Sequence, residues 1–296
     1  MAARVLDGKW VRDRLLAEAR PRVERLPRRP GIAVVLAGNN PASEVYVRNK
    51  VKACEETNIY SEKYTPGDGV TTEELLALVE SLNAKPEIDG ILVQMPLPKQ
   101  VDTARVLMAV SPEKDVDGFH PLNVGYLSTM RPGLRPCTPS GVMEMLRRYE
   151  IPVAGKNAVV VGRSDIVGKP MAMLLLNANA TVTVCHSKTA NLSEICRRAD
   201  ILVAAIGRAA MITAEFIGEG ATVIDVGMNR TSEELAASTG RKPGALIGDV
   251  HPVDVVNRAA AYTPVPGGVG PLTIAMLMIN TIQSSERRQG LCTSSD

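Results

Sequence analysis

The sequence predicts an α/β protein with two α/β domains, the second of them a Rossmann-like, doubly wound parallel sheet. Three observations lead to this prediction. Short runs of Val, Ile and Leu alternate with helical stretches, the alternation breaks in the middle of the chain, and it restarts with a glycine-containing loop. Strands covered on both faces read as continuous apolar runs, and helices between them form the crossovers of a parallel sheet.

In the first half, residues 31–38 (GIAVVLAG) and 89–98 (DGILVQMPLP) have the composition of buried strands. The Arg-rich first twenty residues predict a surface helix. The Asn-Pro pair at 40–41 is typical of a helix start. Residues 72–83 predict another helix, with Glu in its first turn and apolar residues at helical spacing.

The middle of the chain is irregular, because residues 111–125 are rich in Pro, Gly and Asp. A helix is expected to follow at residues 140–150. We therefore expect a first domain at 1–140, completed by a C-terminal helix at 271–288, and a second domain at 141–270. The tail, 287–296, is expected to fray.

Four short apolar runs in the second half predict buried strands, and helical stretches follow the first three of them. The four runs are residues 157–162, 180–185, 200–207 and 222–227. Residues 262–271 (YTPVPGGVGP) predict a rigid loop, because three prolines restrict the backbone there. The loop leads into the last helix.

Composition excludes several classes of protein. The chain has 296 residues, of which 45% are hydrophobic and 22% charged, with a net charge of +2 and no long run of one sign. Nucleic acid and membrane surfaces are therefore not expected as partners. Five cysteines without a C-x-x-C pair and three separated histidines indicate neither a disulfide framework nor a metal site. A reducing, cytoplasmic location is expected.

The segment Val159–Leu176 reads as strand, glycine loop and helix. A helix N-terminus at the carboxyl end of a parallel strand offers free N–H groups and a positive dipole to a phosphate. The glycines at 162 and 168 match neither G-x-G-x-x-G nor a Walker loop. A purely structural strand-to-helix turn would have the same sequence, so this feature alone leaves the function open.

The end of the next strand, residues 185–189 (CHSKT), bears on the choice of nucleotide. In NAD-binding units a carboxylate there holds the ribose 2′-hydroxyl, and this segment has none. Ser187, Lys188 and Arg163 are instead suited to donate to a 2′-phosphate, which favours NADP over NAD. The alternative is an ordinary surface loop.

Four polar residues in the first half are candidates for a chemical site. Tyr46 and Lys50 share one face of the predicted helix, since residues i and i+4 are neighbours. Gln94 places an amide inside an apolar strand, and a buried amide needs partners. Asp117 lies in the KDVDG turn. Each has a structural alternative. Lys50 would be a solvated lysine beside a half-buried Tyr46, Gln94 a packing amide, and Asp117 a turn-capping aspartate.

Together these motifs resemble the bifunctional methylenetetrahydrofolate dehydrogenase/cyclohydrolase family. The resemblance runs in family order from about residue 30 to residue 280. The segments that carry it are NNPASEVYVRNK, GILVQMPLP, SPEKDVDGFHPLNVG, CTPSGV, GKNAVVVGRSDIVGKP, ATVTVCHSKT, ADILVAAIG, VIDVGMNR, GDV and TPVPGGVGPLTIAMLM.

The resemblance implies an enzyme of one-carbon metabolism. It would oxidise 5,10-methylenetetrahydrofolate to 5,10-methenyltetrahydrofolate with NADP⁺ and hydrolyse the product to 10-formyltetrahydrofolate. The resemblance also implies a folate cleft between the two domains and a homodimer formed through the second domain. The implied catalytic residues are Lys50, Tyr46, Gln94 and Asp117; the implied substrate-binding residues add Val93, Met95, Pro266, Gly267 and Gly268; the implied NADP-binding residues are Gly162, Arg163, Ser164, Ser187 and Met228, where Ile is usual.

Two alternatives of function remain at this point. One is a dehydrogenase without the hydrolytic step, which the presence of Lys50 disfavours. The other is a folate- or nucleotide-binding protein without catalysis, which the presence of all four polar residues disfavours. The sequence does not decide whether Lys50 acts as a base or as a cation that steers water.

Overall fold

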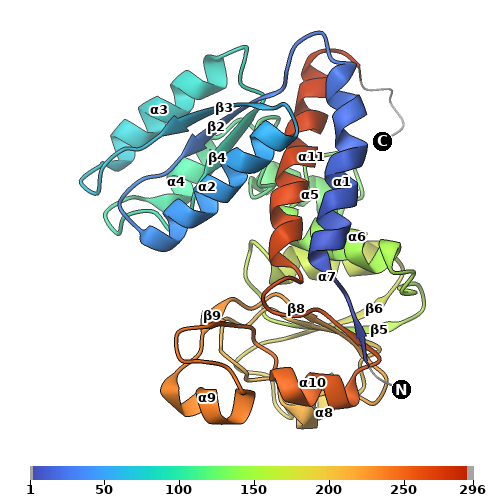
Figure 1. Cartoon of the computed structure of the whole chain (residues 1–296). Helices are drawn as coiled ribbons and strands as arrows, with labels where there is room; N and C mark the ends of the chain where they lie inside the picture. Colours follow the sequence, from blue (N-terminus) through green and yellow to red (C-terminus); the bar gives the residue numbers. More distant parts are fainter. Residues whose placement is uncertain (1–2, 292–296) are drawn as a thin grey trace. The chain divides into compact units, whose positions relative to one another are not determined.

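The computed structural model describes residues 3–291 of the chain (Figure 1). These residues form two compact units. We call residues 13–137 together with residues 274–291 the first unit. Residues 3–12 together with residues 138–273 are the second unit.

The first residues of the chain belong to a different unit than the sequence indicates. The sequence predicts them in the domain at 1–140, but residues 3–12 group with the second unit. Strand β1 (Arg4–Val5) pairs in parallel with β11 (Ala261–Tyr262), and backbone hydrogen bonds of 2.7 and 2.8 Å flank the pair. A two-residue strand has no hydrophobic period, so a sequence pattern cannot reveal it.

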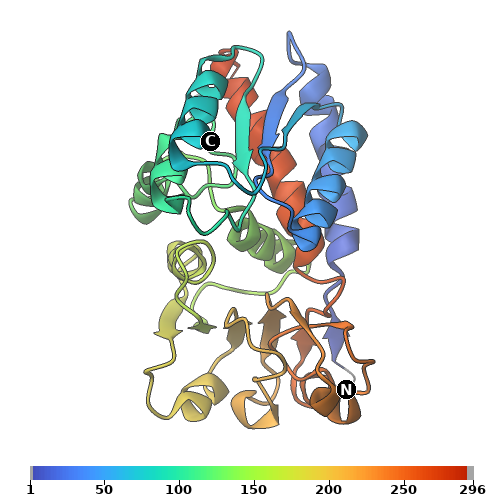
Figure 2. The ribbon, with the colours of Figure 1, turned by 90° about the vertical axis from the view of Figure 1, so that its left-hand side faces the viewer.

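The first unit contains a three-stranded parallel sheet in the order β3–β2–β4. The strands are β2 (Gly31–Val35), β3 (Tyr60–Tyr64) and β4 (Gly90–Val93), and the helices are α1 (Gly8–Glu24), α2 (Pro41–Glu56), α3 (Thr72–Ala84), α4 (Thr103–Ala109), α5 (Pro121–Ser128) and α11 (Gly270–Arg288). Helices α3 and α4 cover one face of this sheet, and α2 and α11 lie on the other (Figure 2). Strands β2 and β4 are buried throughout, as their apolar runs predict.

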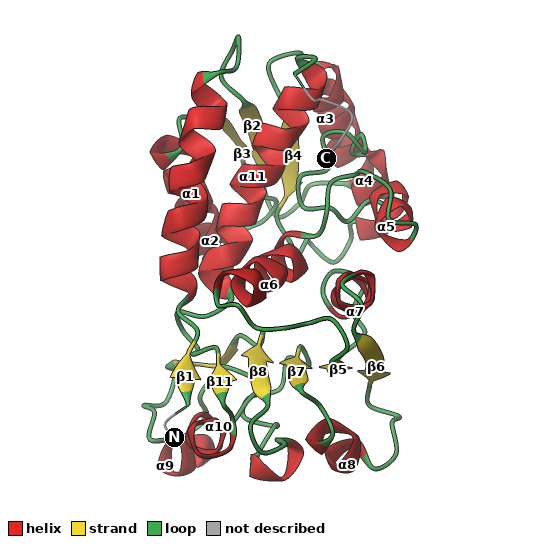
Figure 3. Cartoon of the chain, turned by 90° about the vertical axis from the view of Figure 1, so that its right-hand side faces the viewer, coloured by secondary structure: helices red, strands yellow, loops and turns green. Residues whose placement is uncertain are grey.

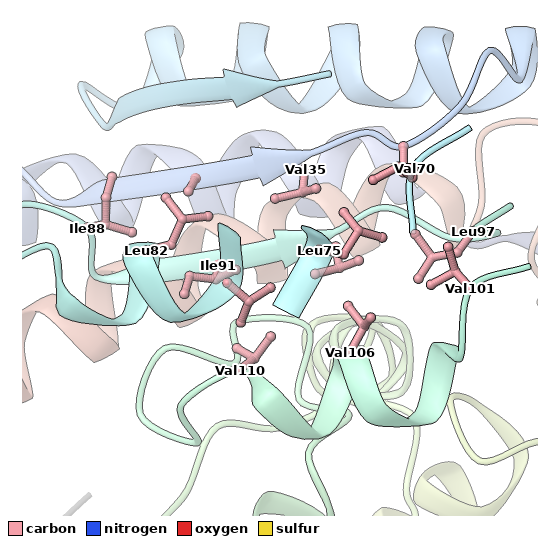
Figure 4. Close-up of a cluster of buried hydrophobic side chains, with 14 residues drawn as sticks. Val35, Val70, Leu75, Leu82, Ile88, Ile91, Leu97, Val101, Val106 and Val110 are labelled. Atoms are coloured by element: carbon pink, nitrogen blue, oxygen red, sulfur yellow. The ribbon is translucent and has the colours of Figure 1, made fainter. Parts of the chain in front are cut away.

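A buried cluster between the sheet and helix α3 forms the core on one face (Figure 4). Helix α3 contributes Leu75, Val79 and Leu82, which follow helical spacing and are all fully buried. Full burial of each such side chain stabilises the fold by about 1.5–3 kcal/mol. The helix begins with a capping box: the Thr71 hydroxyl accepts from Glu74 N at 3.2 Å, and the Glu74 carboxylate accepts from Thr71 N at 2.8 Å.

The second unit is a six-stranded parallel sheet in the order β1–β11–β8–β7–β5–β6, and its strands lie side by side in Figure 3. Helices α6 and α7 cover one face and α8 and α10 the other, so the sheet is doubly wound. Its remaining elements are β5 (Asn157–Val161), β6 (Thr181–Cys185), β7 (Ile201–Ala204), β8 (Thr222–Asp225), α6 (Cys137–Arg148), α7 (Gly168–Asn177), α8 (Leu192–Arg197), α9 (Glu233–Thr239), α10 (Pro252–Arg258), and the antiparallel pair β9 (Asn229–Arg230) and β10 (Leu246–Ile247).

The order of these strands creates a topological switch point. Strand β5 pairs with β6 on one side and with β7 on the other. The connections that leave β5 and β7 therefore diverge at their carboxyl ends, which is where ligands bind in doubly wound sheets. The loop from Gly162 to Gly168 follows β5 at this point.

Two expectations about helices need correction. The helical stretch expected after the third strand of the second unit is a single 3₁₀ turn, Ala214–Phe216. The tail expected to fray from residue 287 instead continues as helix α11 through Arg288, and residues 292–296 lie outside the described part of the chain. Within residues 3–291, no helix has the length and apolar character to span a membrane.

Candidate active site

Helix α2 presents Tyr46 and Lys50 in the first unit. Asn40 accepts a hydrogen bond from Ser43 N at 3.2 Å and so satisfies a donor at the start of the helix. Lys50, one turn after Tyr46, is only 6% exposed. Tyr46 is half-buried, and burial raises the pKa of its hydroxyl. The helix therefore turns a phenol and an ammonium group away from solvent on one face.

Gln94 is the partner of Lys50. The Lys50 ammonium donates to Gln94 Oε1 at 2.9 Å, and Gln94 Nε2 donates to Met95 O at 2.8 Å. The sequence predicts Gln94 inside a strand, and this prediction is wrong. Strand β4 ends at the buried Val93, so Gln94 follows the strand. The two prolines at 96 and 98 cannot donate to a sheet ladder, so the strand is shorter than its apolar run.

Asp115 and Asp117 differ sharply although only one residue separates them. The Asp115 carboxylate accepts from Phe119 N at 3.2 Å, His120 N at 2.8 Å and Asn123 Nδ2 at 2.9 Å, so it caps the turn. In the described part of the chain, the Asp117 carboxylate accepts no hydrogen bond. Burial raises the pKa of Asp117 to about 6, although the positive charge of Lys50 opposes this rise. Asp117 is thus the acceptor left available for a ligand.

The loop that carries Asp117 is anchored by Asn280 of α11. Asn280 Nδ2 donates to Val116 O and to Arg135 O, both at 2.8 Å. Gly118, with φ of +75°, lies so close to the backbone of Arg135 that a Cβ would approach its carbonyl carbon to 2.4 Å. Sequence reasoning missed Asn280, and the available signal was a single amide within the apolar run MLMINTI.

In the second unit, Gly162 begins the loop at the switch point. Its φ is +130°, and a Cβ there would lie 2.1 Å from Ala205 O, so only glycine fits. The Ser164 hydroxyl accepts from Val167 N at 3.3 Å and from Gly168 N, the first backbone donor of α7, at 3.2 Å. The Ser164 O–H proton remains available to donate to a ligand.

The segment after β6 lies beside this loop, because Val161 pairs in register with Cys185 and Gly162 N donates to Cys185 O at 2.9 Å. Arg163, Ser187 and Lys188 are all exposed. Neither Arg163 nor Lys188 forms an ion pair within the described residues. Two cations without a carboxylate partner at this place fit a phosphate group.

A buried carboxylate pair organises the other loops at this edge of the sheet, and the sequence analysis assigned it no role. Asp249 accepts from the backbone N–H groups of residues 206, 207 and 208 and from Asn229 Nδ2, at 2.5–2.9 Å. Asp225, at the end of β8, accepts from Gly227 N, Asp249 N and Val250 N, each at 2.9 Å. Burial raises the pKa of Asp225 to about 7. The signal in the sequence for this pair was a lone acidic residue next to apolar residues: Asp225 in VIDVG and Asp249 in GDV.

The remaining predicted residues also belong to the second unit. Met228 is 51% exposed. In the Pro266-Gly267-Gly268 loop, Gly8 N donates to Gly267 O at 2.8 Å and Gly268 N donates to Pro264 O at 2.7 Å. No group of three or more His, Cys, Asp or Glu side chains in residues 3–291 is arranged to hold a metal ion.

These features define a class of protein. A doubly wound sheet with a glycine loop at its switch point is a dinucleotide-binding unit. The other unit is a separate α/β layer structure with a buried lysine–amide pair and an unpaired carboxylate, which is suited to a small-molecule substrate. The chain is thus a two-unit α/β enzyme that uses a nucleotide cofactor.

Family models identify the particular enzyme family. Residues 6–117 match the tetrahydrofolate dehydrogenase/cyclohydrolase catalytic domain, and residues 136–289 match the NAD(P)-binding domain of the same family. The chain belongs to the tetrahydrofolate dehydrogenase/cyclohydrolase family.

Individual relatives agree with this assignment. The bifunctional protein FolD of Solibacter usitatus is 64% identical over 98% of this chain and 99% of its own length. The structure of the bifunctional FolD enzyme of Campylobacter jejuni has a TM-score of 0.91 at 45% identity and covers 97% of this chain and 100% of that one. The Trypanosoma brucei enzyme, solved with NADP cofactor and an inhibitor, has a TM-score of 0.89 at 39% identity, covering 97% and 98%.

Proposed function

We infer that this chain oxidises 5,10-methylenetetrahydrofolate to 5,10-methenyltetrahydrofolate with NADP⁺ and then hydrolyses the product to 10-formyltetrahydrofolate. Membership of the family gives the two reactions. Within the chain, the observation that carries the proposal is the buried Lys50 ammonium, held at 2.9 Å by the uncharged amide of Gln94. This pair provides a proton-handling group that forms no ion pair within the described residues.

The oxidation needs little from protein side chains. The methylene carbon lies between two nitrogens, whose lone pairs spread the positive charge that develops when a hydride leaves. NADP⁺ supplies the acceptor for that hydride. No proton is removed, so the protein acts by holding the folate in position. We assign this task to Tyr46, Val93, Met95 and Asp117 of the first unit.

Asp117 suits the pterin end of the folate. The amino-pyrimidine edge of a pterin presents N–H donors, and a carboxylate accepts two of them side by side. The Asp117 carboxylate accepts no hydrogen bond from the described residues, whereas Asp115 is fully used by its own turn. Asp117 therefore orients the substrate through its ionised form.

The hydrolysis needs proton transfer. Water must lose a proton as it attacks, and the ring nitrogen must gain one as the ring opens. Lys50 has ammonium donors beyond the one bonded to Gln94 and lies near enough to Asp117 for its charge to lower the pKa of that carboxyl. We assign to Lys50 the activation or steering of the water, and to Gln94 the positioning of Lys50.

NADP fits the second unit. The segment after β6 has no carboxylate to repel a 2′-phosphate, and the exposed Arg163, Ser187 and Lys188 lie where they can donate to one. We assign the diphosphate to the loop that begins at Gly162 and contains Ser164, and a backbone contact to Met228. The close approach of Gly162 to Ala205 O supports this, because it holds the start of the loop against the end of β7, at the switch point.

We further propose a homodimer formed through the second unit and a cytoplasmic location. Strand β6 is at the edge of the sheet and exposes Thr181, Thr183 and Val184. The four cysteines in the described residues are all free and buried, as is typical of a reducing compartment.

Replacement of Lys50 by Met tests the assignment. We expect hydrolysis of the methenyl product to fall by at least about 100-fold, because a positioned acid–base group contributes roughly that much. Oxidation with NADP⁺ should persist. The absorbance of methenyltetrahydrofolate reports both steps, since it rises with oxidation and decays with hydrolysis. NAD⁺ in place of NADP⁺ tests the cofactor.

Lys52→Met is the matched control, because Lys52 is an exposed lysine on the same helix. It should retain both activities. Undiminished hydrolysis in Lys50→Met would refute the assigned role. Loss of both activities in a folded Lys50→Met variant would instead assign Lys50 to folate binding.

A further inference from the structure

A cavity of about 500 Å³ lies within the first unit, apart from the Lys50–Gln94 pair. Its lining includes Ser111, Asn123, Tyr126 and Gly133, together with Ser284 and Arg287 of α11. Ser284 Oγ donates to Asp89 O at 2.7 Å, so the cavity lies by the residue that precedes β4. Gln94 follows the opposite end of that strand.

Arg287 lines the cavity, and Arg135 lies two residues after the lining residue Gly133. Neither Arg287 nor Arg135 has a side-chain hydrogen bond or ion pair within the described residues. Arg135 is partly buried, and both burial and the positive charge of Arg287 lower its pKa. The repulsion between two like charges is relieved when an anion contacts both of them.

The neighbouring arginines provide a contrast. Arg28 and Arg288 both donate to Asp89, at 2.7 and 2.8 Å, and Asp89 is fully buried. The first unit therefore supplies one buried carboxylate that both of these arginines contact. Within the described residues it supplies no such carboxylate for Arg135 and Arg287.

Helix α11 positions both Arg287 and the segment that carries Arg135. Asn280, Ser284 and Arg287 lie on one face of α11, since they are four and three residues apart. Asn280 Nδ2 donates to Arg135 O at 2.8 Å and so holds the Arg135 segment against that face. The exposed Glu113 is the one acidic side chain in the cavity lining within the described residues, and it forms no ion pair with Arg287.

We propose that this cavity binds a small oxyanion-bearing molecule, a phosphate or a carboxylate compound, through Arg287 of its lining, with the neighbouring Arg135 as the second cation. The volume is in the range of small-molecule sites. The hydroxyls of Tyr126 and Ser111 have no partner within the described residues and complete a donor set for an anion. The site is separate from both assigned ligand sites.

Isothermal titration calorimetry of the full chain with inorganic phosphate, and separately with citrate, tests the proposal. Saturating NADP⁺ is present throughout, so that the cations near Ser187 are occupied. At least one probe is expected to bind one site per chain in the millimolar range or tighter. Arg287→Gln and Arg135→Gln should each weaken that binding by about 10-fold, since each removes charge-assisted hydrogen bonds.

Arg25→Gln is the matched control, because Arg25 is an exposed arginine of the first unit outside the cavity. It should bind as the parent does. Circular dichroism and the dehydrogenase rate verify that each variant is folded. Tyr126→Phe, a milder change within the cavity, should weaken binding about 3-fold by loss of one hydrogen bond. The absence of saturable binding by both probes at about 10 mM, or unchanged binding in Arg287→Gln, would overturn the proposal.

Discussion

Two lysine ammonium groups are buried in the first unit, and their partners differ. Lys114 donates to the carbonyl oxygens of Leu82, Asn83 and Lys85 at 3.0, 2.7 and 2.8 Å. All three of its donors are used at the C-terminal end of α3, which is a structural role. Lys50 donates to Gln94 alone among the described residues. A buried lysine with donors left over is the one suited to act on a substrate.

Asp117 gives a prediction about pH at the residue scale. Burial raises its pKa to about 6, so the carboxylate that accepts from the pterin is lost as the pH falls through that value. We expect kcat/KM for 5,10-methylenetetrahydrofolate to fall by about 10-fold per pH unit below 6 and to be level above it. Steady-state kinetics across this range is the measurement.

Asp117→Asn should lower kcat/KM above pH 6 and abolish the decline below it. Glu80→Gln, an exposed change on α3, should leave the profile unaltered. The profile would contradict the assignment if the Asn variant retained the same decline, because another group would then be responsible for it.

At the scale of elements, the sequence predicts best what is buried on both faces. Strands β2, β4, β5, β7 and β8 are continuous apolar runs because helices cover both sides of their sheets. Strand β3 (YSEKY) was not predicted. It is an edge strand with polar, partly exposed residues, so it contains no continuous apolar run. Strands of two residues, such as β1 and β11, have no pattern at all.

Some residues of the candidate site can be predicted from the sequence, and others cannot. Tyr46 and Lys50 are predictable as neighbours because one helix sets their spacing. The role of Asn280 is not predictable, because the carbonyl that accepts its hydrogen bond belongs to Val116, 164 residues away in the sequence. The Asp249 carboxylate similarly holds backbone N–H groups about 40 residues away. Such contacts depend on the packed fold and leave only an isolated polar residue in an apolar run.

Gly162 gives a prediction about the loop after β5. Replacement by Ala places a Cβ 2.1 Å from Ala205 O at a φ of +130°, so the loop must move away from the switch point. We expect KM for NADP⁺ to rise by about 10-fold or more, and stability to fall by about 1–3 kcal/mol from overpacking and backbone strain. Cofactor titration and thermal denaturation measure the two effects.

Gly155→Ala separates the two causes. Gly155 also has a positive φ, +75°, but a Cβ there meets nothing within 4 Å. It should cost about 1 kcal/mol of stability from backbone strain and leave KM for NADP⁺ unchanged. An equal rise in KM for both variants would refute the specific role of the Gly162 loop.

At the scale of the whole molecule, the two edges of the second unit's sheet are unequal. One edge is the two-residue strand β1, and the other is the five-residue strand β6. Strand β6 (TVTVC) contains neither a charged residue nor a proline, and Val184 is 41% exposed. Helix α7 contacts β6, and its Leu176 is 61% exposed. Natural edge strands are usually protected against pairing, so this edge is suited to a second copy of the chain.

Val184→Lys tests that association. A lysine on β6 places two like charges at a symmetric contact, since each copy contributes the same residue. We expect a dimer for the parent chain and a shift toward monomer for the variant, measured by sedimentation velocity at several concentrations. Val256→Lys is the matched control, because Val256 of α10 is 43% exposed in the same unit but does not belong to the β6 edge. A monomeric parent, or an unchanged dimer in Val184→Lys, would show that β6 is not the contact.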